Sequence, residues 1–311
     1  MHFIRLMIAT VLTTLWVIFL PGFIAATIIL WGAVILICGL YIDRNRILAL
    51  FIGSTIFMLV LIPDISFISY YLLAVGVPVL LMSRLLAGRH DYYKIRKTGM
   101  VGAVIGVTFL LGLLFNQGGA GDTIFEQLSS NIYTVIESYV ELSPPAGIPQ
   151  DELAAMMEIA SQMAAMFFPA VQYIQAILSI FIILAIAASF ARRKGLDQLQ
   201  KKHYSMEQMP WQLSWVVIIS LAIWLWDFQG SSFIGANALM VMAMLCLYYG
   251  NAVMIYFYYR LPGTRRIIIV VLFLVTVWFF TPYVIMAAII LGLFDSLVDV
   301  RKLKKEDKKI S

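Results

Sequence analysis

The sequence predicts an all-α integral membrane protein with about ten transmembrane helices and both termini in the cytoplasm. Apolar residues make up 62% of the chain and charged residues 13%, whereas soluble domains are about half apolar and a quarter charged. All 22 lysines and arginines fall in alternate gaps between the apolar stretches. Because short cytoplasmic loops are enriched in Lys and Arg, this alternation predicts both the number of spans and their orientation.

The positions of the spans follow from the length that a helix needs to cross a bilayer, about 20 apolar residues. Residues 3–42 exceed that length and are broken at Pro21-Gly22, and 265–299 are broken at Thr281-Pro282. A single helix over 3–42 would be about 60 Å long, twice the hydrocarbon thickness. We therefore expect a tight hairpin at each break. The expected spans are 4–20, 23–42, 47–62, 66–84, 99–116, 167–191, 211–227, 232–259, 265–280 and 283–299; a count as low as eight stays open.

Residues 117–166 form the one sizeable segment expected outside the cell. It contains seven acidic residues and no lysine or arginine. Apolar residues recur at helical spacing from Ile124 to Tyr139, which predicts an amphipathic helix that ends at Ser143-Pro144-Pro145. A second helix is expected to start near Asp151, to continue into the next span and to bend at Pro169. The pair is expected to connect spans, to lie on the outer membrane surface or to cap a cavity; its acidity favours the cap over the surface.

Residues 1–311 are thus expected to form a single polytopic domain, with an external helical insertion at 117–166 and a basic cytoplasmic tail at 300–311. Small residues form stripes at Gly99, Gly102 and Gly106, and at Ala187 and Ala191. Such stripes let helices approach closely. Packing within the chain is the simpler interpretation, and contact with a partner subunit is the alternative.

The predicted spans contain no ionisable side chain near their centres, where a charge usually marks a proton relay or an ion site. Asp295 and Asp299 lie one helical turn apart at the end of the last span, beside Arg301. We expect them to pair with cationic groups at the inner interface; the alternative is that these three residues dock a cytoplasmic partner.

Uncharged polar residues in the spans are the candidates for binding a solute. Gln172 and Gln175 lie on one helical face directly after the external segment. With Tyr173 and Asn237, they are the residues expected to meet a small polar solute that arrives from outside. Hydrogen bonding between helices is the simpler role for all of them.

The sequence carries few signs of an enzyme. His90-Asp91 could bind a metal, but no second His or Cys lies nearby to complete a site. No P-loop, HExxH or GxSxG motif is found, and Cys38 and Cys246 lie inside predicted spans. We expect no catalysis, no metal and no cofactor. The net charge of +5 comes from residues beside membrane spans, so membrane lipid rather than nucleic acid is the expected partner.

Three motifs carry a resemblance to a known family. They are Met209-Pro210-Trp211, Tyr248-Tyr249-Gly250-Asn251-Ala252, and Gly292-Leu293-Phe294-Asp295-Ser296 followed by Asp299 and Arg301. The chain resembles the YybS-like family of bacterial polytopic membrane proteins. That family in turn distantly resembles the S-components of energy-coupling-factor transporters and the rod-shape protein MreD. The first span has Ala9-xxx-Thr13 where S-components have Ala-xxx-Ala.

The resemblance implies a multi-pass protein of the bacterial inner (plasma) membrane with one of two roles. The first is a small-solute-binding transporter component, similar to an S-component and powered by a separate ATPase or coupling module. The second is a non-catalytic envelope scaffold, similar to MreD, that gathers cytoplasmic envelope proteins. A closed polar cavity beneath 117–166 would favour the first role, and a solidly packed bundle the second.

Overall fold

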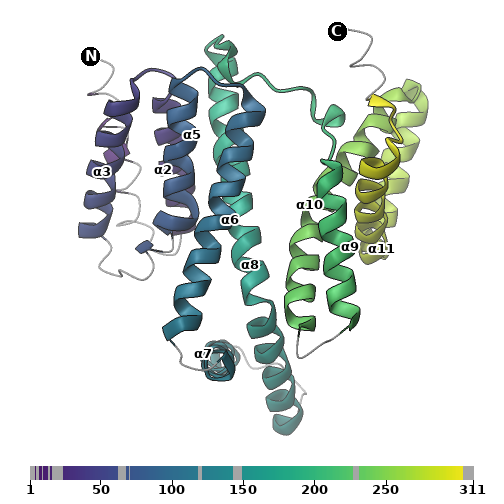
Figure 1. The fold of residues 1–311 in the computed structure, drawn as a ribbon. Coiled ribbons are helices and arrows are strands. Elements are labelled where there is room, and N and C mark those ends of the chain that lie inside the picture. Colours follow the sequence, from purple (N-terminus) through teal and green to yellow (C-terminus); the bar gives the residue numbers. More distant parts are fainter. Residues whose placement is uncertain are drawn as a thin grey trace. The chain divides into compact units, whose positions relative to one another are not determined.

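The computed structural model describes residues 24–61, 71–117, 121–142, 149–226 and 231–303, together with residues 4, 7, 8, 10–12, 15, 68 and 69. Every regular element in these ranges is a helix, so the predicted all-α class is confirmed. The turn at Pro21-Gly22, most of the predicted span 4–20 and most of the basic tail lie outside the described residues. The chain divides into two compact units, residues 1–201 and 202–311, and each is described by itself (Figure 1).

The first unit is a bundle of helices around one apolar core. Its helices are α2 (Ile24–Cys38), α3 (Arg44–Leu61), a π-helical turn (Leu72–Gly76), α5 (Val77–Ala87), α6 (Tyr92–Gln117), α7 (Gly121–Leu142) and α8 (Gln150–Arg193). The core joins side chains from α2, α3, α5, α6 and α8 and includes Ile35, Met82, Ile95 and Leu184, all fully buried. This packing holds in place α6 and α8, the helices that flank α7 in the sequence.

The glycine stripe of α6 packs against the π-helical turn and α5. A Cβ atom built on Gly106 would lie 2.1 Å from the carbonyl oxygen of Leu73, and one on Gly102 would lie 3.4 Å from Pro78. Pro78 lacks the backbone N–H that a regular α-helix would use at this point, which accounts for the widened turn before it. Ala187 and Ala191 on α8 are buried in the same core. Packing within the chain, the simpler interpretation of both stripes, is confirmed.

Within residues 117–166, the segment predicted to lie outside the cell, the structure has the two helices that the sequence predicts. α7 ends at Leu142, directly before the sequence Ser143-Pro144-Pro145, and α8 begins at Gln150 and continues without interruption through Pro169. In Figure 1, α7 is seen end-on, while α6 and α8 run along the page. α7 therefore lies across the direction of the two helices that flank it.

The second unit contains α9 (Trp211–Trp226), α10 (Ser232–Arg260) and α11 (Gly263–Val298). α11 has non-helical backbone angles at Phe280, next to the predicted break at Thr281-Pro282. It begins three residues after the end of α10, and there the guanidinium of Arg266 donates a hydrogen bond to the carbonyl of Tyr259. Just beyond the other end of α11, the backbone carbonyl of Arg301 accepts a hydrogen bond from the hydroxyl of Tyr256. Both ends of α11 therefore lie beside the last turns of α10, so the helix reverses direction at its kink.

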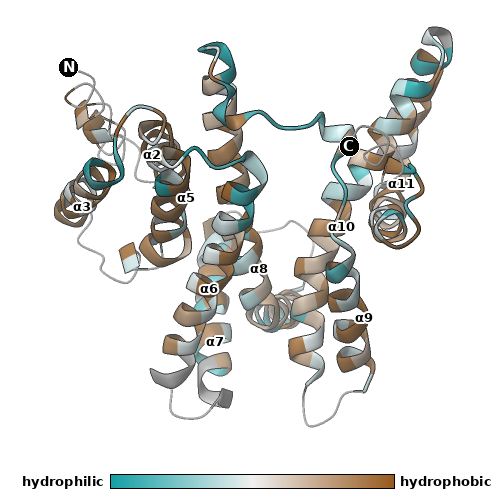
Figure 2. Cartoon of the chain, turned by 45° about the horizontal axis from the view of Figure 1, so that its top comes forward, coloured by the Kyte–Doolittle hydropathy of each residue, from teal (hydrophilic) through white to brown (hydrophobic). Residues whose placement is uncertain are grey.

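Within the described ranges, four helical stretches are long and apolar enough to cross a membrane: Tyr92–Leu114, Gln150–Arg193, Ser232–Arg260 and Trp278–Val298. Shorter apolar helices occupy Ala26–Cys38, Leu72–Ala87 and Trp211–Trp226. Figure 2 shows hydrophobic colouring along these helices and hydrophilic colouring at the connections between α5 and α6 and between α8 and α9. The chain is a membrane protein with several apolar helices; the total of ten spans and the side on which the termini lie stay predictions.

Candidate functional site

Two of the polar residues predicted to meet a solute bond to neighbouring helices. The hydroxyl of Tyr173 lies 2.8 Å from the Thr108 hydroxyl of α6. The amide of Gln175 donates to the hydroxyl of Tyr71, with 3.5 Å between nitrogen and oxygen. These contacts tie α8 to α6 and to the turn before α5, which is the simpler role that the sequence allowed.

The other two predicted residues do not join them in one described pocket. Gln172 is half-buried on α8. Asn237 belongs to the second unit, is buried, and donates to the carbonyl of Phe233 one turn earlier in α10. A cavity of about 20 Å³ lies beside Trp31, Met58 and Tyr71, which is room for about one water molecule.

A much larger hollow lies between α7 and the start of α8. It has a volume of about 710 Å³ and is open to solvent. Its carboxylates come from Glu126, Asp151 and Glu158, and the hydroxyls of Ser129 and Ser161 meet at 3.3 Å on its floor. This α7–α8 groove combines an acidic rim with hydroxyl groups, so its chemistry suits a cationic or hydroxylated molecule.

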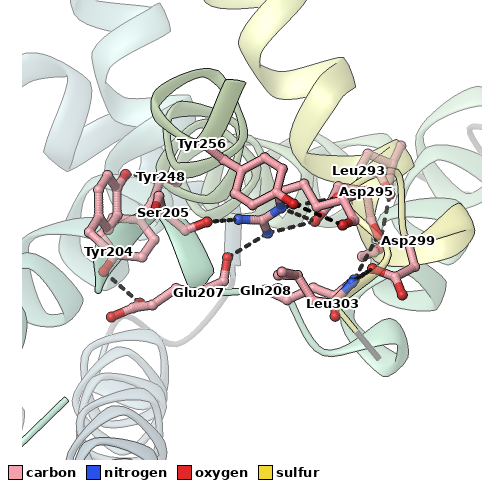
Figure 3. Close-up of polar contacts among 12 residues, drawn as sticks. Tyr204, Ser205, Glu207, Gln208, Tyr248, Tyr256, Leu293, Asp295, Asp299 and Leu303 are labelled. Carbon is pink, nitrogen blue, oxygen red and sulfur yellow. Dashed lines mark hydrogen bonds and ion pairs between the residues drawn. The ribbon is translucent and has the colours of Figure 1, made fainter. Parts of the chain in front are cut away.

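The second unit contains a buried ion pair at the end of α11. The guanidinium of Arg301 lies 2.7 Å from the carboxylate of Asp295, and both side chains are almost completely removed from solvent. Arg301 also donates to the backbone carbonyls of Ser205 and Glu207, the latter at 2.6 Å. These contacts, shown in Figure 3, join the end of α11 to the segment that precedes α9.

Further contacts surround this ion pair and complete what we call the Arg301 cluster. The amide of Gln208 donates to the carbonyl of Asp295 and, at 3.2 Å, to the carboxylate of Asp299. Asp299 ends α11 in the left-handed conformation, with φ of 51°, and its carboxylate accepts the backbone N–H of Leu303. The cluster therefore gives both predicted aspartates a structural role, while a role for these residues in docking a partner stays a prediction.

Tyr204, in the segment before α9, and Tyr248 on α10 extend the cluster. The hydroxyl of Tyr204 donates to the carbonyl of Tyr248 at 2.5 Å, and the hydroxyl of Tyr248 donates to the carboxylate of Glu207 at 2.8 Å. Burial raises the pKa of Tyr204 to about 12, and the negative charge of Glu207 adds to the effect. The phenol therefore stays protonated as a hydrogen-bond donor well above neutral pH.

His90 and Asp91 lie directly before α6. The carboxylate of Asp91 accepts the backbone N–H of Lys94 at 3.1 Å, as helix-capping residues do. The ring of His90 lies 3.4 Å from the ammonium group of Lys94. Across the described parts of the chain, no group of three His, Cys, Asp or Glu side chains could hold a metal ion.

Sequence reasoning missed Ser205, Glu207 and Tyr256. Glu207 had one available signal, since it is the only acidic residue between Asp197 and Asp227 and it directly precedes a predicted span. Ser205 and Glu207 bind Arg301 through their backbone carbonyls. Any residue carries such a carbonyl, so no residue type could have indicated this contact.

Comparison with known proteins gives a family. No curated protein and no solved structure matches the chain significantly. A match to a protein family extends over residues 7–296, which takes in the helices of both units and Asp295 of the Arg301 cluster. The chain therefore belongs to the family described as "Predicted membrane protein (DUF2232)".

Proposed function

We propose that the chain is a non-catalytic interaction protein of a bacterial inner (plasma) membrane that organises partners through its exposed surfaces. The observation that carries this proposal is the use of Tyr173 and Gln175 in bonds between helices. Each joins a polar group on α8 to a polar group of another element, and the Tyr173–Thr108 bond lies on the exposed side of the bundle rather than in its apolar core. Side chains used in this way serve helix packing rather than a solute, which favours a scaffold over a solute receptor.

One end of the first unit supplies a surface for such partners. The cations Arg84, Arg89, Lys97, Arg192 and Arg193 are exposed where α5 and α8 end and α6 begins. A cluster of exposed cations attracts acidic proteins and anionic headgroups. An acidic cytoplasmic partner protein is therefore the class that this surface suits.

The test is a deletion strain complemented by variants of the chain. Deletion is expected to change cell shape or division and to leave uptake of labelled vitamins and amines unchanged. A Tyr173→Phe/Gln175→Leu variant is expected to restore normal cells. An Arg192→Gln/Arg193→Gln variant, with its level in the membrane verified, is expected to restore them poorly. Normal shape with impaired uptake would contradict the proposal.

The α7–α8 groove favours a second candidate, capture of a small cationic solute for a separate ATPase module. Its volume falls within the range of about 300–1,000 Å³ that is typical of ligand pockets. A panel of polyamines and cationic vitamins would then raise the melting temperature of the purified protein. Glu126→Gln and Glu158→Gln should abolish that shift, whereas Glu141→Gln, on α7 outside the groove lining, should leave it intact. A panel without any shift would remove this candidate.

A further inference from the structure

We infer that α7 lies in the headgroup layer of the membrane, with its apolar face turned toward the lipid. The first observation is the distribution of side chains around the helix. At 100° per residue, Glu126, Ser130, Glu137 and Glu141 fall on one face. Leu128, Ile132, Val135, Tyr139 and Leu142 fall on the opposite face.

Part of the apolar face is uncovered in the structure. Val135 is 54% exposed, Tyr139 70% and Leu142 83%. Exposed apolar side chains clustered on one face of a helix mark a contact with lipid or protein rather than with water. Whether lipid or protein covers this face follows from the depth of α7 in the membrane and from the direction in which the apolar face points.

The depth of α7 follows from its contact with α8. The hydroxyl of Ser129 on α7 meets that of Ser161 on α8. From Ser161 to Arg192 at the basic end of α8, the helix rises about 46 Å at 1.5 Å per residue. A bilayer with its headgroups is about 40–45 Å thick. When Arg192 lies at the headgroups of one leaflet, α7 therefore lies at the headgroups of the other.

The direction of the apolar face follows from the groove. The α8 residues that line the groove, including Asp151 and Glu158, lie before or just at the contact with α7, on the side away from Arg192. The α7 residues that line the groove include Glu126 and Ser130 from the acidic face, together with Phe125, Ser129 and Tyr133. The acidic face thus points away from the membrane, and the opposite, apolar face points along α8 toward the bilayer.

The orientation of α7 agrees with this placement. It lies across α6 and α8 (Figure 1), both of which contain stretches long enough to span a membrane, so α7 runs along the membrane surface. α6 presents Phe109, Leu113 and Leu114 to the surroundings on its approach to α7, so the apolar surface continues from the span toward this helix. The apolar face of α7 therefore contacts the interface of one leaflet, which is the external leaflet in the predicted topology. This placement favours the membrane surface over the cap that the acidity of the segment suggested.

The proposal is tested with single cysteines on the two faces of α7. Val135→Cys and Tyr139→Cys sample the apolar face, and Thr134→Cys and Glu137→Cys are the matched controls. All four are made in a Cys38→Ala/Cys246→Ala background, labelled with an environment-sensitive fluorophore and reconstituted into phosphatidylcholine vesicles. Neutral lipid is sufficient because α7 contains no lysine or arginine.

Labels at 135 and 139 should show blue-shifted emission, quenching by nitroxide lipids and protection from iodide. Labels at 134 and 137 should show the reverse. Equal iodide quenching at all four positions would overturn the proposal, because α7 would then stand in water. Protection of 135 and 139 from both quenchers would also overturn it, since a second copy or another protein segment would then cover the face.

Discussion

The helices of the first unit and the helices of the second unit pack through different kinds of contact. The core of the first unit is a broad apolar cluster with contributions from five helices, and contacts such as that of Tyr173 with Thr108 join its helices through uncharged groups. The second unit has a small buried cluster around Met209, Cys246 and Tyr249, together with a buried ion pair. In a membrane, association of helices depends on close packing and on polar contacts. The first unit thus relies mainly on packing, and the second also on charge.

This contrast can be measured unit by unit, because each unit contains one of the two cysteines of the chain. Cys38 in the first unit and Cys246 in the second are both free and buried. In a Cys246→Ala background, reaction of Cys38 with a thiol dye during heating reports unfolding of the first unit. In a Cys38→Ala background, Cys246 reports the second.

The largest effect is expected from Arg301→Met. The change leaves the Asp295 carboxylate buried without its counter-ion, which typically lowers the free energy of unfolding by about 3–5 kcal/mol. The Cys246 signal should therefore shift to a much lower temperature, while the Cys38 signal stays in place.

An Arg301→Met/Asp295→Leu variant serves as the control. Replacing both members of a buried pair is far less harmful than removing one of them. We expect partial recovery, because the carbonyls of Ser205 and Glu207 still lose their donor. If Arg301→Met left the second unit unchanged, the ion pair would contribute nothing and the contrast between the units would fail.

Glycine-to-alanine changes should produce the next largest effects, and in both units. A Cβ on Gly250 would lie 1.8 Å from the carbonyl oxygen of Ala288, and one on Gly292 would lie 2.0 Å from that of Cys246. Gly106 in the first unit has an equally close contact with Leu73. Each substitution should lower the free energy of unfolding by about 1–3 kcal/mol, and only the reporter of the substituted unit should move. Gly112→Ala, with no atom within 4 Å of the added carbon, is the matched control.

A smaller effect is expected from Tyr204→Phe, and it should depend on pH. The pKa of Tyr204 is raised from 10.0 to about 12 in the folded protein, so folding favours the neutral phenol. The resulting stabilisation is present below pH 10 and is lost as the pH rises through about 12. With Phe at this position, the temperature of the Cys246 transition should fall less steeply as the pH rises over that range. Tyr139→Phe, in the first unit, should leave the slope unchanged.

The helices were predictable from the sequence to the extent that local patterns specify them. The end of α7 before Ser143-Pro144-Pro145, the start of α8 near Asp151 and the reversal of α11 beside Thr281-Pro282 all depend on proline chemistry or apolar length, which are local. The Arg301 cluster depends on contacts between residues more than ninety positions apart, and two of its acceptors are backbone carbonyls. The α7–α8 groove arises from the angle between two helices, and no local pattern gives that angle.

The smallest expected effect concerns the bond between Tyr173 and Thr108, and it tests the packing of the first unit. Hydrogen bonds between transmembrane helices contribute about 0.6 kcal/mol on average. A double-mutant cycle with Tyr173→Phe and Thr108→Val, followed through Cys38, should therefore give a coupling of that size. A coupling of several kcal/mol would show that polar contacts hold the first unit as firmly as charge holds the second. The packed core would then lose its leading role in the first unit, and the two units would no longer differ in kind.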